Sequence, residues 1–265
     1  MLLYSNFIIQ IGGYINKHTH IAENFINTMT EIASLLGQSD QNIDYDTAEA
    51  PMHKGVITAF TRLQDRAKAA GFDLAVASAY RSHERQLTIW NAKLSGNRPV
   101  YDSHNQLLSL QGLSAWQQLE AVLHWSALPG ASRHHWGTDI DVYDRAAIEP
   151  GYQLQLSLAE VSVGGPFYAL HQWLDELLVA EPELGFFRPY NHDRGGVAPE
   201  RWHLSYGPIA AHYQKALSLE AIRLCCESCD MLLKETVLDN LPLIKSRYID
   251  VPVDCYPESC QFIFK

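Results

Sequence analysis

Two short segments of the chain bring together the residue types that hold a catalytic metal ion. Residues 132–141 read SRHHWGTDID, and residues 200–203 read ERWH. They supply imidazoles and carboxylates, and a catalytic zinc ion uses three such ligands and leaves its fourth position to water. A further carboxylate beside that water can act as its general base. The two segments therefore predict a metal-dependent hydrolase.

The candidate ligands consist of a pair that is close in the sequence and a third residue that is distant. His134 and Asp141 lie seven positions apart (141 − 134), whereas His203 lies far along the chain. A close pair and a distant third ligand would let one metal ion cross-link two elements of a sheet. Alternation along a strand places Asp139 on the same face as Asp141. Asp139 could ligate the metal, but we favour a hydrogen bond from a ligand imidazole to its carboxylate. His135 would point away from His134 and is predicted to support the site or to be exposed.

A third segment completes a resemblance to a known family. Residues 78–86 read SAYRSHERQ. The ordered motifs Ser-x-Tyr-Arg-Ser-x-x-x-Gln, Ser-x-His-x-x-Gly-x-x-x-Asp and Glu-x-Trp-His resemble the signature of VanY-type D-alanyl-D-alanine carboxypeptidases. These belong to a wider group with lysostaphin-type peptidases and the hedgehog signalling domain. The resemblance runs from about Ala59 to Tyr206, and it departs from the family at Asp139, where a small residue is usual.

The resemblance implies roles for individual residues. It implies a Zn²⁺ ion held by His134, Asp141 and His203. Glu200 would take a proton from the zinc-bound water and deliver it to the leaving amine. Arg81 would stabilise the developing oxyanion or the substrate carbonyl, although an ion pair with a nearby acid is an alternative. Four further matched residues are candidates for substrate binding or for framework roles, namely Ser78, Tyr80, Gln86 and Ser132.

The implied activity is zinc-dependent removal of a terminal D-alanine from peptidoglycan stem peptides or their precursors. Three alternatives stay open: an L,D-carboxypeptidase, a cell-wall endopeptidase, and a non-catalytic zinc-containing binding domain. The residues do not separate the enzymatic alternatives, because loops shape the substrate pocket. The presence of Glu200 and Arg81 beside the three implied ligands argues against the non-catalytic domain.

The elements that position these residues predict an α+β fold. We expect a small, mostly antiparallel central sheet that carries the zinc site and is flanked by helices. Short apolar runs predict strands at residues 74–80, 138–143 and 202–206. Ser82 is expected to cap the helix that follows Arg81. Apolar residues at helical spacing predict helices at residues 21–36, 56–71, 84–94, 113–125 and 167–177.

The chain is expected to divide near residue 219. Residues 1–219 would form the peptidase domain with an N-terminal helical region, and residues 220–265 a C-terminal extension. The extension is expected to contain a helix and then an irregular tail, and to supply no catalytic group. It carries all five cysteines, which could bind a structural zinc ion, form disulfides or stay free: Cys225, Cys226, Cys229, Cys255 and Cys260.

Composition restricts the partners. A chain of 265 residues with 47% hydrophobic and 19% charged residues is typical of a globular protein. The formal net charge of −10 argues against nucleic acid, because phosphate binding requires a basic surface. Residues 1–16 lack the positive region and clear cleavage site of a secretory signal, and their apolar run is too short and interrupted to span a membrane. The substrate class suggests the bacterial cell envelope, but neither location nor oligomeric state follows from the sequence.

Overall fold

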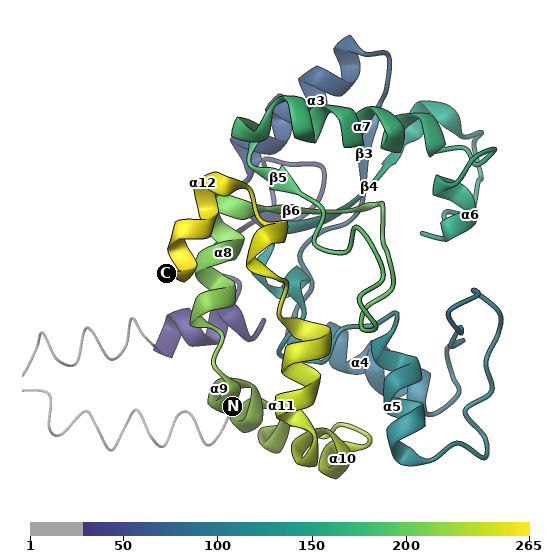
Figure 1. The fold of residues 1–265 in the computed structure, drawn as a ribbon, viewed down its shortest axis with the longest axis vertical. Coiled ribbons are helices and arrows are strands. Elements are labelled where there is room, and N and C mark those ends of the chain that lie inside the picture. Colours follow the sequence, from purple (N-terminus) through teal and green to yellow (C-terminus); the bar gives the residue numbers. More distant parts are fainter. Residues whose placement is uncertain (1–28) are drawn as a thin grey trace, which may run out of the picture.

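The central element of the fold is a four-stranded sheet with strand order β3-β4-β6-β5. The structure is a computed structural model that describes residues 29–265 (Figure 1). Every neighbouring pair of strands is antiparallel. The predicted α+β class with a small antiparallel sheet and flanking helices is therefore confirmed. The strands are β3 (Leu74–Ser78), β4 (Asp139–Asp144), β5 (Phe186–Phe187) and β6 (His203–Tyr206).

The alternation of side chains along β4 divides the sheet into an apolar face and a polar face. Ile140 and Val142 are buried in one hydrophobic cluster with Leu204 of β6. The intervening residues Asp139 and Asp141 point to the opposite face, because successive side chains of a strand alternate. This alternation separates the core from the site.

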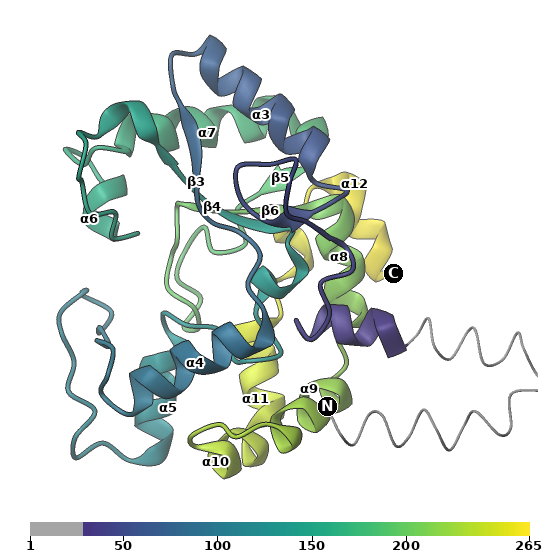
Figure 2. The same ribbon diagram turned by 180° about the vertical axis from the view of Figure 1, so that it is seen from behind.

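Two helices cover the apolar face of the sheet. They are α3 (Ile57–Ala69) and α7 (Tyr168–Ala180). Both lie on the same side of the sheet in Figures 1 and 2. Phe60, Leu63, Leu170 and Leu174 from these helices join the cluster that contains the apolar residues of β4. The stripes at helical spacing in the sequence are thus the buried faces of these helices.

A second group of helices lies on the other side of the sheet (Figure 2). Among them are α4 (His83–Leu94) and α5 (Ala115–Leu123). The Ser82 side chain accepts a hydrogen bond of 3.2 Å from the Arg85 N–H, which confirms the predicted cap of α4. Arg81 consequently lies between the end of β3 and the start of α4.

The C-terminal region is helical, and the expected irregular tail is wrong. Val237, Leu241, Ile244 and Tyr248 recur at helical spacing and are all buried. Pro242 interrupts this run but stands in the first turn of its helix, where a missing N–H costs nothing. The division of the chain near residue 219 stays a prediction. After α8 (Gly207–Ala216) the helices are α9 (Leu219–Ser228), α10 (Lys234–Asp239), α11 (Leu241–Ile244), a π-helical turn (Lys245–Ile249) and α12 (Glu258–Gln261).

Two short segments form elements that the sequence analysis did not predict. Residues 38–51 contain β1 (Ile43–Asp44), which pairs antiparallel with β2 (Met52–His53). The short helix α6 (Leu158–Val161) was not expected; it begins with a capping box made by Ser157 and Glu160. Such two- and four-residue elements are too short to produce a periodic pattern in the sequence.

Only the second half of the predicted N-terminal helix lies within the described residues, and there residues 29–35 are helical. The expectations for residues 1–16 lie outside the described residues. No helix within residues 29–265 has the length and apolar character needed to cross a membrane. All five cysteines of this part of the chain are free.

Candidate metal centre and active site

The sheet register brings together the three residues that the sequence implied as metal ligands. Asp141 of β4 lies directly opposite His203 of β6 in the antiparallel pair, a position at which side chains are close neighbours. His134 comes from the 3₁₀ turn Arg133–Trp136, which precedes β4. All three side chains are buried. Two strands and one turn thus converge on one point.

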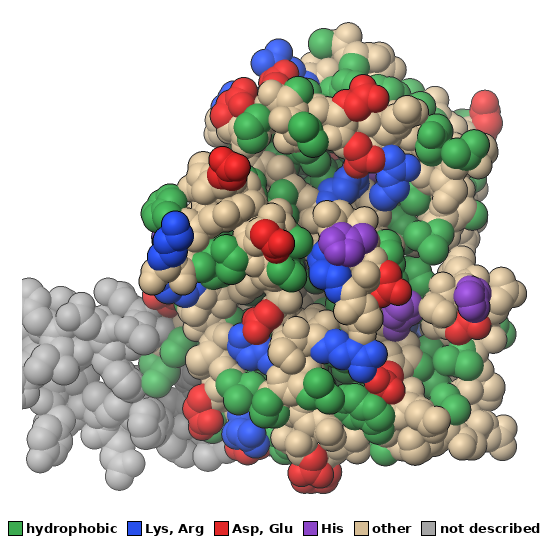
Figure 3. Space-filling model, in the orientation of Figure 1, with side chains coloured by type: hydrophobic (Ala, Val, Ile, Leu, Met, Phe, Trp, Pro, Cys, Tyr) green, Lys and Arg blue, Asp and Glu red, His purple; other side chains and the backbone are tan. Residues whose placement is uncertain are grey.

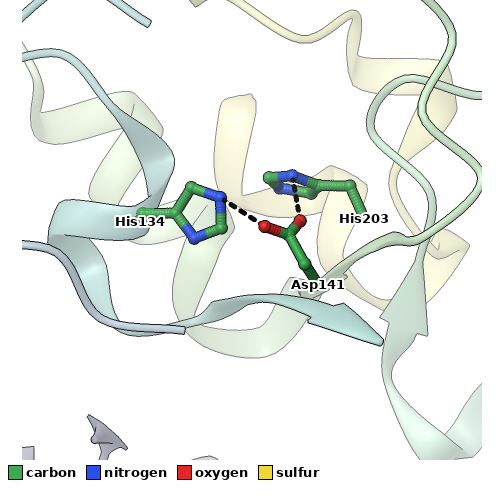
Figure 4. Close-up of side chains that lie close together, drawn as sticks. All are labelled: His134, Asp141 and His203. Atoms are coloured by element: carbon green, nitrogen blue, oxygen red, sulfur yellow. Dashed lines mark ion pairs between the residues drawn. The ribbon is translucent and has the colours of Figure 1, made fainter. Parts of the chain in front are cut away.

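The distances within this group match the spacing of ligands around a zinc ion. The Nε2 atom of His134 lies 3.4 Å from Asp141 Oδ2, and the Nδ1 atom of His203 lies 3.3 Å from Asp141 Oδ1 (Figure 4). One ligand atom from each residue lies within 4.8 Å of the others. Tetrahedral ligands at about 2.0–2.1 Å from a metal ion are themselves about 3.3–3.4 Å apart. The donor set therefore fits zinc in chemistry, and its two contacts to Asp141 match the spacing of zinc ligands.

The outer nitrogen of each imidazole is held by an acceptor. His134 Nδ1 lies 2.8 Å from the carbonyl oxygen of Ala79, and His203 Nε2 lies 2.9 Å from Asp139 Oδ1. When the outer nitrogens donate to these acceptors, the inner nitrogens, His134 Nε2 and His203 Nδ1, face the candidate metal position. The structure thus places Asp139 in the supporting position that we favoured, and Asp139 is not in the group of candidate ligands.

The electrostatics of the group also suit a cation. Burial lowers the pKa of His134 to about 4, so this imidazole is neutral, as a ligand must be. Burial alone would lower the pKa of His203, but its hydrogen bonds to Asp139, Asp141 and Glu200 raise it well above its usual value. Three carboxylates around one ring thus produce a strongly negative local potential, which would stabilise a bound cation.

Arg133 is the functional residue that the sequence analysis missed. Its Nε donates a 2.8 Å hydrogen bond to Asp139 Oδ1, and both side chains are almost completely buried. Asp139 also accepts hydrogen bonds from Thr138 (2.7 Å) and Ser205 (3.1 Å). Burial would raise the pKa of Asp139, but the charge of Arg133 and the donated hydrogen bonds outweigh it and lower the pKa. The available signal was an arginine directly before His134 and six positions before Asp139.

Arg133 in turn connects the site to the C-terminal region. One terminal nitrogen of its guanidinium donates to Gln214 Oε1 (3.1 Å) and to the hydroxyl of Tyr256 (3.0 Å). The other donates to Ser205 Oγ at 2.7 Å. The Tyr256 hydroxyl donates to Gln214 Oε1 at 2.8 Å, which closes the network. Tyr256, from the predicted extension, therefore helps to hold Arg133. Arg133 in turn holds Asp139, which orients His203.

Glu200 lies next to the candidate ligands without joining them. Its Oε2 is 3.4 Å from His203 Nδ1, and its side chain is 14% exposed. Burial raises the pKa of this carboxyl above its usual value, and the hydrogen bond from His203 opposes the rise. A carboxylate with a raised pKa beside a metal site has the chemistry of a general base.

Arg81 is held in place by neutral residues. Its guanidinium donates to Gln86 Oε1 (2.9 Å) and to Ser78 Oγ (3.1 Å). No carboxylate of the described chain lies within ion-pair distance of it, so the alternative of a structural ion pair is not what the structure shows. The His135 side chain contacts the backbone of this segment, with Nδ1 2.6 Å from the carbonyl oxygen of Arg81. His135 is buried, not exposed.

The four candidates for substrate binding have different positions. Ser132 lines the pocket, and its buried hydroxyl has no hydrogen-bond partner among the described residues. Ser78 and Gln86 hold Arg81 and are not in the pocket lining, which favours framework roles for them. Tyr80 packs edge-to-face on Tyr45 with ring centroids 6.4 Å apart, so its ring is directed to another part of the surface.

A pocket of about 520 Å³ opens over the candidate metal centre. Arg81, Ser132, Glu200 and the three candidate ligands all line it. Further parts of its wall come from the end of α4, the loop that follows α4, the segment after α5, residues 155–157 and the segment before β6, which contributes Tyr190, Val197 and Trp202. This size and the mixture of charged and aromatic walls are typical of a small-ligand site.

Comparison with curated proteins gives a relative of named activity. A D-alanyl-D-alanine carboxypeptidase of Enterococcus faecalis is 28% identical over 164 residues, which cover 60% of this chain and 50% of the relative. Two uncharacterised proteins of Haemophilus influenzae also match. One is 46% identical over 72 residues (27% of this chain, 49% of the relative), and the other 33% identical over 124 residues (46% and 92%). The chain thus spans about half the length of two of these relatives.

Several solved structures are also similar. VanYB in complex with D-Alanine-D-Alanine has 21% identity and a TM-score of 0.46, covering 73% of this chain and 92% of that one. The LdcB LD-carboxypeptidase has 23% identity and a TM-score of 0.41, covering 72% and 71%. A family model described as VanY, D-alanyl-D-alanine carboxypeptidase, matches residues 49–209 of this chain. Because that match covers more than half of the 265 residues, the chain belongs to the VanY D-alanyl-D-alanine carboxypeptidase family.

Proposed function

We propose that this protein is a zinc-dependent D,D-carboxypeptidase that removes the terminal D-alanine from peptidoglycan stem peptides or their precursors. One observation carries the proposal: Glu200 lies at the edge of a His134–Asp141–His203 group whose candidate ligand atoms all lie within 4.8 Å. The named relative from Enterococcus faecalis and the family match support the choice of substrate.

The residues of the site divide the reaction between them. His134, Asp141 and His203 would hold the zinc ion, which supplies Lewis acidity and lowers the pKa of a coordinated water. Glu200 accepts the proton of the attacking water and delivers it to the departing amine. Arg81 donates to the carbonyl oxygen as negative charge develops on it. Ser132 lines the pocket, and its buried hydroxyl, which has no partner among the described residues, is proposed to contact the bound peptide.

The positions of Glu200 and Arg81 favour an enzyme over a binding domain. A buried acid with a raised pKa and a guanidinium that has no acidic partner among the described residues are costly features for a domain that only binds. Both line the pocket that contains the candidate metal centre. They are the groups that general-base and oxyanion chemistry requires.

The first prediction concerns activity. Zinc-loaded protein is expected to release free D-alanine from peptides that end in D-Ala-D-Ala, measured by mass spectrometry of the products. Glu200→Gln should keep its zinc and lose about 10²–10⁴-fold in kcat, because it removes only the proton transfer. The control peptides carry an L,D terminal bond or an internal cross-link.

The product pattern decides between the enzymatic alternatives. Release from the L,D-linked ends alone would assign an L,D-carboxypeptidase, and internal cleavage would assign an endopeptidase. Zinc-loaded protein that hydrolyses none of these peptides would contradict the proposal and favour a binding domain.

A further inference from the structure

The pocket contains positive charge that the proposed reaction does not use. Lys93, in the last turn of α4, and Arg98, in the loop after it, both line the pocket together with Glu200 and His203. Neither side chain forms an ion pair with a carboxylate of residues 29–265, although this chain has a net charge of −10. Lys and Arg side chains gather with His side chains in the middle of one face in Figure 3.

The hydrogen bonding of Lys93 leaves several donors free. Its Nζ donates a 2.6 Å hydrogen bond to Ser126 Oγ, another residue of the pocket wall. An ammonium group has three N–H donors, so two stay available. Because Ser126 Oγ accepts from Lys93, its own hydroxyl proton can also be donated to a ligand. Two charged side chains and one hydroxyl therefore offer donors to the same pocket.

The surroundings of Lys93 disfavour its charged ammonium form when no anion is bound nearby. Burial, together with the nearby positive charges of Arg98 and Arg81, lowers the pKa of its ammonium to about 8, although Glu200 opposes this shift. A lysine that only compensated the helix dipole would stand in solvent, as Lys68 does in the last turn of α3. A bound anion would offset the cost of holding Lys93 charged in this position.

We propose that Lys93 and Arg98, with the Ser126 hydroxyl, form a subsite that binds a carboxylate of the substrate peptide. A carboxylate is planar and accepts several hydrogen bonds, and contacts from charged donors are among the stronger hydrogen bonds. This inference rests on the proposed function and adds a determinant of specificity: the pocket selects peptides by a carboxylate. The terminal carboxylate is one source, and a carboxylate carried elsewhere on the peptide is the other.

A binding experiment tests the subsite without turnover. Zinc-loaded Glu200→Gln protein is titrated calorimetrically with an N-acetylated peptide that ends in D-Ala-D-Ala, as the free acid and as the C-terminal amide. Adding Lys93→Met should weaken binding of the acid by about tenfold or more, equal to about 1.4 kcal/mol, and leave the amide within about twofold. Arg98→Gln should weaken the acid less, because Arg98 is exposed.

The matched control is Lys68→Met, which removes a lysine from the last turn of another helix and should leave both titrations unchanged. Lys93→Arg should restore part of the preference for the acid. An amide-ended peptide with one glutamate side chain identifies the source. If Lys93→Met weakens that peptide and leaves the free acid unchanged, the subsite binds the internal carboxylate.

Two results would overturn the subsite. One is that Lys93→Met weakens binding of neither the free acid nor the amide-ended glutamate peptide, at an unchanged melting temperature. The other is an equal loss for the acid and the amide, since Lys93 would then shape the pocket and not bind the carboxylate. Failure of the proposed function has a different signature: the unmodified protein would release no D-alanine even though it discriminates the acid from the amide.

Discussion

At the scale of single residues, the imidazole of His203 contacts two acids, Asp139 and Glu200, whose pKa values are shifted in opposite directions. His203 directs Nε2 to Asp139 and Nδ1 to Asp141 and Glu200. Asp139 is paired with Arg133 and has a lowered pKa, so it stays ionised and holds the ring. Within residues 29–265, Glu200 has no cationic partner at ion-pair distance other than His203, and burial raises its pKa. Neighbours, not residue type, assign one acid to positioning and the other to proton transfer.

A prediction at this scale concerns the metal. His203→Ala is expected to lose more than about 100-fold in zinc affinity, because removing a ligand costs more than removing a group that only orients one. Competitive titration with a chelator measures the affinity, and elemental analysis measures the stoichiometry. His192→Ala, on the exposed loop before Glu200, is the control and should bind zinc normally. Full zinc occupancy in the His203 variant would refute the assignment of this ligand.

At the scale of elements, the site depends on the pairing of β4 with its two neighbours. Asp141 is opposite His203 on β6 and Ser78 on β3. A shift of the register by one residue would turn Asp141 toward the apolar face, where α3 and α7 pack. The burial of Ile140 and Val142 against those helices therefore fixes the position of the acids on the other face.

The C-terminal region takes part in the same positioning through Tyr256, which lies just before α12. Tyr256→Phe would keep the stacking of this ring on Phe187, at 4.4 Å between centroids, and remove the hydroxyl that contacts Arg133 and Gln214. We expect the melting temperature to fall by about 2–4 °C, as for the loss of about 1 kcal/mol. We also expect zinc affinity to fall by up to about tenfold, because the effect on His203 is indirect.

Chelator competition and thermal melts of the purified variant measure the two effects. The control is Tyr248→Phe, whose hydroxyl lies outside the Arg133 network. A lower melting temperature with unchanged zinc affinity would show that Tyr256 serves stability alone.

At the scale of the whole molecule, one hydrophobic core joins both ends of the described chain. Leu35, Trp90 of α4 and Leu119 of α5 are buried in the same cluster as Ile244 of α11. The indole of Trp90 also donates a 3.0 Å hydrogen bond to the carbonyl oxygen of Leu232. The C-terminal helices thus complete the core on which α4 rests, and α4 carries Lys93.

This shared core makes a prediction about stability. Truncation after Leu219 should abolish cooperative thermal unfolding or make the protein insoluble, since it exposes the apolar surfaces of α4 and α5.

A single substitution tests the same shared core. Ile244→Ala should lower the free energy of unfolding by about 2–5 kcal/mol, because Ile244 is fully buried at 0% exposure. Chemical denaturation measures the loss. The adjacent Leu243 is 47% exposed, so Leu243→Ala is the control and should change stability much less. A truncated protein that keeps a cooperative transition would contradict the shared core.

The features that could be predicted from the sequence are those that depend on residues close together in the chain. Alternation along residues 138–143 placed Asp139 and Asp141 on one face, and Ser82 marked the start of α4, because strand pleating and helix capping depend on a few adjacent residues. The motif residues identified the candidate ligands and Glu200 through their order. The sequence analysis expected one helix and then an irregular tail in the extension, so the later C-terminal helices were missed, although Val237, Leu241 and Ile244 recur at helical spacing.

Only the tertiary structure decided which of these residues act on one another. Arg133 and Tyr256 are 123 positions apart and meet only after the sheet, α8 and the C-terminal helices have packed. The contact of Asp139 with His203 needs the register of β4 on β6, and the meeting of Lys93 with Ser126 needs α4 to lie along the segment after α5. Local patterns do not encode such contacts, because their free energy comes from burial and hydrogen bonding between distant parts of the chain.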